Sequence, residues 1–133
     1  MVYEFNILIE DGTTKDDPAE EEAQLVPGII TMVEVDFPPG CHKLVHVVVK
    51  EGGYQMFPRN PEGTMSADDH VIAFNPHQEL TRGHHILKVF GWSPLTSYDH
   101  KITLRFNVQP EEIATPWQMA KDLVIILKHM LGL

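Results

Sequence analysis

The residues best suited to chemistry in this 133-residue chain are its eight histidines and its single cysteine. Imidazole nitrogens are common transition-metal ligands, and a thiolate can act as a metal ligand or as a nucleophile. A zinc ion holds its ligands at about 2.0–2.3 Å, so the donor atoms must converge on one point. His42 and His46 share one face of a predicted strand but lie about 13 Å apart at about 3.3 Å per residue, which is too far for one ion.

No other pair of histidines has the spacing of a metal-binding motif. His84 and His85 are adjacent, so they point to opposite faces of a strand that contains both. A metal site would need neighbours from different strands, and the candidate set is Asp69, His70, His84 and His100. We expect ordinary surface or pairing histidines, with no bound metal or cofactor.

No nucleophile stands in the sequence context of a catalytic residue. No serine occupies the Gly-x-Ser-x-Gly turn of hydrolases, and the neighbouring pair Cys41-His42 does not by itself make a catalytic dyad. A lone cysteine is more often a small buried apolar residue. The glycines match neither nucleotide-binding fingerprint. The sequence therefore predicts no catalytic residue and a protein that is not an enzyme.

Three aromatic residues stand in or beside predicted loops: Tyr54, Trp92 and Tyr98. Aromatic rings at such places stack on sugars or anchor a protein partner, and they also fill the ends of a β-sandwich core. A small carbohydrate-binding module is therefore one alternative function. A metal-dependent enzyme that uses the histidine and aspartate set above is a second.

Composition limits the partners. The formal net charge of −9 argues against binding to a nucleic-acid backbone or to an anionic membrane surface. No apolar run approaches the roughly 20 residues of a membrane-spanning helix, and the first ten residues lack the pattern of a signal peptide. A single cysteine excludes an internal disulfide framework. We expect a protein partner and a cytoplasmic or virion-associated location.

The elements that would position these residues are β-strands. Residues 1–109 show the alternation of apolar and polar side chains that is typical of strands, for example at Ile102, Leu104, Phe106 and Val108. About seven strands are predicted, at 3–9, 31–37, 41–50, 54–57, 70–75, 85–92 and 99–108. The acidic segment 10–23 is predicted to be a solvated loop. Short strands without helices between them favour an antiparallel sandwich.

Residues 80–108 resemble the final strand pair of the immunoglobulin-like modules of bacterial and phage proteins. Leu80 and Gly83 precede an alternating strand, a loop follows, and the closing strand ends at Val108. The cysteine pair of antibody domains is missing, since Cys41 has no partner. The resemblance implies an immunoglobulin-like sandwich and roles in adhesion, display or spacing, and it carries over no functional residue.

The C-terminal region predicts an amphipathic helix over 115–131. Thr115 is a suitable N-cap, Pro116 fits the first helical position, and Gly132 is a suitable stop. At 100° per residue the apolar side chains cover an arc of about 180°, which is wider than the stripe of about 100° needed to pack on one sheet. The predicted interface residues are Trp117, Ala120, Leu123, Val124, Leu127, Met130 and Leu131.

Two destinations for this apolar arc stay open: the protein's own sheet and a neighbouring subunit. Because the sandwich offers no catalytic motif, the helix is the best candidate for a functional surface. The sequence therefore predicts a non-enzymatic structural or interaction protein that forms a homo-oligomer or docks on a larger body.

Overall fold

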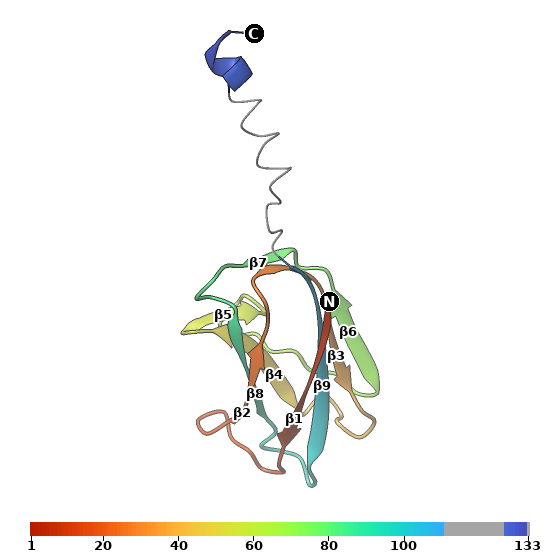
Figure 1. Ribbon diagram of the computed structural model, residues 1–133. Helices are drawn as coiled ribbons and strands as arrows, with labels where there is room; N and C mark the ends of the chain where they lie inside the picture. The colour runs from red at the N-terminus through yellow and green to blue at the C-terminus, as the bar shows by residue number, and fades with distance from the viewer. Residues whose placement is uncertain (111–126, 133) are drawn as a thin grey trace.

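A computed structural model describes residues 1–110 and 127–132 (Figure 1). The described chain is mainly β, as predicted, with a single turn of helix at residues 127–130. Its nine strands are β1 (Val2–Ile9), β2 (Ala19–Gln24), β3 (Gly28–Phe37), β4 (His46–Glu51), β5 (Tyr54–Phe57), β6 (His70–Phe74), β7 (Gln78–Leu80), β8 (Ile86–Trp92) and β9 (His100–Pro110).

The strands form two antiparallel sheets that face each other (Figure 1). The first, here called sheet A, has the order β1-β9-β3-β6, with β7 also paired to β3; sheet B has the order β2-β8-β4-β5. An immunoglobulin domain keeps its first two strands as neighbours in one sheet. Here β1 and β2 lie in different sheets, so the immunoglobulin-like topology is not confirmed. The observed order is that of a jelly roll.

The core lies between the two sheets and is built by the alternation of side chains along each strand. In β9, Ile102, Leu104, Phe106 and Val108 are fully buried, while the residues between them face outward. Val47 and Val49 of β4, with Leu87 and Val89 of β8, meet them from sheet B. The predicted period-two pattern of β9 is therefore the pattern that fills the core.

The two sheets approach each other closely where β1 meets β8. A Cβ atom added at Gly91 would lie 2.3 Å from Cδ1 and 2.9 Å from Cγ1 of Ile9, whose side chain is fully buried. Gly91 occupies an inward-facing position of β8, where the other inward residues are leucine and valine. The absence of a side chain at Gly91 is what makes room for Ile9.

Two strands lie where the sequence pattern predicts loops. β2 overlaps the predicted acidic loop 10–23, and β7 lies between the predicted strands 70–75 and 85–92. β2 is an edge strand that pairs only with β8, and of its side chains only Ala23 is fully buried. Glutamates on an exposed edge strand leave almost no hydrophobic alternation, so the local pattern resembles a loop.

A third difference concerns the start of β4. The strand predicted from Cys41 begins at His46. Residues 41–44 instead form a turn, in which the Leu44 amide donates to the Cys41 carbonyl at 2.8 Å. His42 and Lys43 have φ angles of 50° and 60°, in the left-handed region that interrupts an extended strand.

Most of the predicted helix 115–131 lies outside the described residues. In the described part, the Leu131 amide donates to the Leu127 carbonyl at 3.1 Å, which is the hydrogen bond of a helical turn. No helix in the described part of the chain has the length and the hydropathy that a membrane span requires.

Candidate interaction surface

The described end of the C-terminal helix exposes its apolar side chains. Leu127, Met130 and Leu131 are 49%, 77% and 71% exposed. Residues at i, i+3 and i+4 lie on one face of a helix, so these three form a continuous apolar surface, here called the helix-end surface. The other predicted interface residues, which are Trp117, Ala120, Leu123 and Val124, lie outside the described residues.

An apolar groove lies between the edge strands β5 and β6. It has a volume of about 410 Å³, and its walls include Phe57, Met65, Ile72 and Phe74, with Arg59 at its margin. Both strands pair on one side only, β5 with β4 and β6 with β3. We call this feature the sheet-edge groove. The pattern of the sequence does not predict this groove, because its walls come from two strands that belong to different sheets.

The sheet-edge groove lies at the end of the sandwich from which the chain leaves the last strand. The Arg59 guanidinium donates to Gln78 Oε1 of β7 at 2.7 Å. β7 pairs with the start of β3, where Gly28 is opposite both Leu80 and Pro110, the last residue of β9. β9 therefore ends on the same side of the sandwich as the groove, at the top of Figure 1.

The three aromatic residues predicted to bind a ligand lie in different surroundings. Tyr54 is exposed at the start of β5, and Tyr98 is exposed in the loop before β9, with its ring centroid 4.9 Å from that of His100. Trp92 is only 9% exposed and stacks on His46 at 6.0 Å. They do not share one platform on which a sugar could stack.

The four residues of the candidate metal set are not arranged as ligands of one ion. Asp69 and His70 lie at the exposed start of β6, whereas His84 lies in the loop before β8 and contacts Glu51 at 3.1 Å. His100 is buried beside Cys41. Within residues 1–110 and 127–132, no group of three or more histidine, cysteine or acidic side chains is placed to hold a metal ion.

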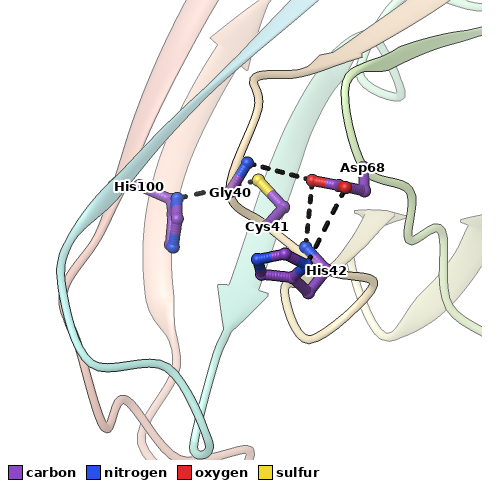
Figure 2. Close-up of polar contacts among 5 residues, drawn as sticks. All are labelled: Gly40, Cys41, His42, Asp68 and His100. Atoms are coloured by element: carbon purple, nitrogen blue, oxygen red, sulfur yellow. Dashed lines mark hydrogen bonds and ion pairs between the residues drawn. The ribbon is translucent and has the colours of Figure 1, made fainter.

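Cys41, His100, His42 and Asp68 form the cluster that most resembles a catalytic site (Figure 2). Cys41 Sγ lies 3.7 Å from His100 Nδ1, and both side chains are buried. Asp68 Oδ1 accepts the amide hydrogens of Gly40 at 3.0 Å and His42 at 3.1 Å. Asp68 Oδ2 lies 3.9 Å from His42 Nδ1, so the carboxylate contacts His42 and not His100.

The electrostatics of this cluster oppose thiolate chemistry. Burial raises the pKa of Cys41, and the nearby Asp68 carboxylate raises it further. A reactive cysteine needs the opposite surroundings, a cationic neighbour and access to solvent. The two backbone hydrogen bonds instead give Asp68 a structural role, because they fix the turn at residues 40–43.

Sheet B carries a second hollow on its outer face. Its volume is about 150 Å³, and Lys15, Lys50, Phe90 and Trp92 contribute to its walls. Phe90 and Trp92 point outward from β8 and alternate with the inward-facing Val89 and Gly91. Two outward-facing aromatic residues in one strand are a sequence pattern that could have indicated this hollow. The loops that complete the hollow show no comparable pattern in the sequence.

The chain matches no known protein-family model, and no curated protein is detectably similar to it in sequence. Among solved structures, it is similar to a crystal structure of PirA, with 9% identity, a TM-score of 0.45, and coverage of 79% of this chain and 94% of that chain.

Two further structures show comparable similarity. The Bacillus endospore appendages, described as disulfide-linked pili, give 13% identity and a TM-score of 0.40, over 82% of this chain and 88% of that chain. Tomato aspermy virus gives 10% identity and a TM-score of 0.40, over 86% and 82%. At such low scores these similarities carry no argument about function, and the established description of the chain is a mainly β fold of two antiparallel sheets.

Proposed function

We propose that this protein is a non-enzymatic structural or interaction protein that forms a homo-oligomer through its C-terminal helix. The exposure of Leu127, Met130 and Leu131 carries the proposal, because all three project from one face of the described helical turn into solvent. Burying a leucine or methionine side chain contributes about 1.5–3 kcal/mol. In the sequence, Trp117, Ala120, Leu123 and Val124 continue the same apolar face.

The surface that receives this helix is the sheet-edge groove of a second copy. Its lining is dominated by apolar side chains, including Phe57, Ile72 and Phe74, and it flanks the end of the sandwich at which β9 ends. A helix face that docks in an apolar groove is a common mode of protein recognition. Docking on a larger body, within the cytoplasm or on a virion, is an extension of the same proposal.

The alternative functions have less support. A carbohydrate-binding module needs accessible aromatic rings on a shared surface, and Trp92 is nearly covered. A metal-dependent enzyme needs converging ligands, whereas His84 pairs with Glu51 and His100 lies against Cys41. The immunoglobulin-like topology inferred from residues 80–108 is not needed for the proposal, which rests on the two apolar surfaces.

Light scattering during size-exclusion chromatography tests the proposal on the full chain. We expect a mass of two or more chains at high micromolar concentration, falling toward one chain on dilution. The variant with Leu127→Ser, Met130→Ser and Leu131→Ser should be monomeric. Ile72→Glu, in the groove, should also lower the mass. Circular dichroism should show that both variants keep their β-structure.

Leu95→Ser is the matched control, because Leu95 is an exposed leucine of the loop before β9, outside both surfaces. It should leave the mass unchanged. A wild-type protein that stays monomeric at high micromolar concentration would overturn the proposal. An oligomer that survives the triple substitution would assign assembly to another surface.

A further inference from the structure

The hollow on the outer face of sheet B is lined by positively charged side chains, although the protein as a whole is acidic. The chain carries 19 acidic and 10 basic residues. The hollow is nevertheless lined by Lys15, Lys50, Phe90 and Trp92, together with Gln55 and Thr64, and by no carboxylate. A cationic, partly aromatic recess in an acidic protein is suited to a small anion that has an apolar body.

One wall of the hollow is the loop 58–64, which the protein holds firmly over the sheet. Gln55 Nε2 lies 2.7, 2.9 and 3.1 Å from the carbonyl oxygens of Pro58, Asn60 and Gly63. Thr64 Oγ1 is 2.9 Å from His46 Nδ1 in β4. A single side-chain amide thus gathers three loop carbonyls, so the wall is formed before any ligand arrives.

The opposite wall is the loop 10–18, which carries Lys15. Ser93, a fully buried residue after β8, fixes this loop through three hydrogen bonds. Its amide donates to Thr13 O at 2.9 Å, its hydroxyl donates to Glu10 O at 3.1 Å, and its carbonyl accepts from the Gly12 amide at 3.2 Å. The loop that positions Lys15 is therefore anchored directly beside Trp92.

The two lysines rest on the aromatic rings of the hollow. Lys15 Nζ lies 5.7 Å from the Trp92 ring centroid, and Lys50 Nζ lies 5.4 Å from that of Phe90. Among the described residues, neither ammonium group forms an ion pair with a carboxylate. Lys88, on the same outer face, does pair with Glu20 at 2.9 Å. Two ammonium groups thus remain available to neutralise an anion.

We propose that the sheet-B hollow binds a small carboxylate attached to a six-membered ring. The two lysines hold the carboxylate, and the ring packs on Phe90, which is less buried than Trp92. The hollow has a volume of about 150 Å³, which is that of about five water molecules at about 30 Å³ each, and this size suits a small ligand. An aromatic carboxylate and a uronic acid share this chemistry.

Isothermal titration calorimetry on the full chain tests the proposal, with benzoate and glucuronate as the two probes. At least one should bind at millimolar concentration, and the stronger of the two identifies the class of ring. Benzyl alcohol and glucose, which keep the ring and lack the charge, should bind at least about tenfold more weakly. Affinity should also fall as salt is added, since exposed ammonium groups are screened.

Three variants separate the contributions of charge and ring. Lys15→Gln and Lys50→Gln should each weaken binding about tenfold, and Phe90→Leu should weaken it by removing the aromatic surface while keeping an apolar side chain. Lys101→Gln is the matched control, because Lys101 is an exposed lysine of β9 in the other sheet. It should leave the affinity unchanged.

Three results would overturn the inference: no binding of either probe, equal binding of the neutral analogues, or full affinity in both lysine variants. None of them bears on self-assembly, because the residues substituted in the hollow, Lys15, Lys50 and Phe90, line neither the helix-end surface nor the sheet-edge groove. Oligomeric mass measured on the same samples would therefore keep a failure of this inference distinct from a failure of the proposed function.

Discussion

Replacing Gly91 by alanine tests how the two sheets are packed. The new Cβ atom would lie 2.3 Å from Cδ1 of Ile9, whereas carbon atoms in contact lie about 3.5–4.0 Å apart. Ile9 is fully buried, so its side chain can make room only by leaving its rotamer within a filled core. The nearest atom is the end of a side chain and not backbone, so the Ile9 side chain can move, and this movement lowers the free energy of unfolding.

Two opposing effects set the size of that cost. Alanine within a strand is intrinsically better than glycine by about 0.5–1 kcal/mol, and inserting a methyl group into a packed core costs about 1–3 kcal/mol. Because the overlap with Ile9 exceeds 1 Å, the packing cost should win. We expect Gly91→Ala to lower the free energy of unfolding by about 1–2 kcal/mol.

Urea denaturation of four proteins measures this effect: the wild type, Gly91→Ala, Ile9→Val and the double variant. Ile9→Val alone should cost about 0.5–1.5 kcal/mol. It removes Cδ1, the atom that the new methyl group meets first, so the double variant should cost less than the sum of the single changes. Gly53→Ala is the matched control, since a Cβ atom at Gly53 would meet nothing within 4 Å.

The reasoning would be refuted if Gly91→Ala were as stable as the wild type. It would also be refuted if the costs of Gly91→Ala and Ile9→Val were simply additive. Either result would mean that β1 and β8 do not approach each other as the structure describes. A change in the slope of the denaturation curve would instead point to an altered denatured state.

Three further predictions concern single residues. Hydrogen bonds from the His42 amide and neighbouring amides hold the pKa of Asp68 below its usual value of 3.8. The ionised carboxylate therefore stabilises the fold above pH 3.8, and this stabilisation is lost as the pH falls through the lowered pKa. In the Asp68→Asn variant, the free energy of unfolding measured by urea denaturation should fall less steeply at acid pH. Cys41 is buried and has a raised pKa, so Ellman's reagent should label it slowly in the native protein and quickly in urea; rapid native labelling would contradict its burial. In a Trp117→Phe variant, the emission of the nearly covered Trp92 should resist iodide quenching, and efficient quenching would restore the carbohydrate-binding alternative.

Local pattern was enough to predict the strands that face the core. In β9, each apolar residue from Ile102 to Val108 is buried on one side and each residue between them faces outward, so the sequence alternates as the structure does. β2 and β7 were not predicted, because such strands are held by backbone hydrogen bonds to a partner strand as much as by the burial of their own side chains. Glu20, for example, is held in a strand by pairing with Phe90, far along the chain.

The strand order could not be predicted for a related reason. Residues 80–108 suggested an immunoglobulin-like pair of strands, but in the structure β8 and β9 lie in different sheets. The alternation of apolar and polar residues in β8 or β9 does not indicate which sheet the strand joins. The same limit applies to the sheet-B hollow, because Lys15 and Thr64 approach it from loops whose positions depend on Ser93 and Gln55.

The place of β9 in sheet A has a consequence for the order of folding. β9 lies between β1 and β3, and β1 pairs with no other described strand. Met1 and Val108, which are 107 positions apart, are joined by a hydrogen bond. During synthesis β1 must therefore wait, with both edges unpaired, until β9 has left the ribosome. Such distant pairing slows folding and leaves the unpaired edges of a strand exposed to aggregation until it forms.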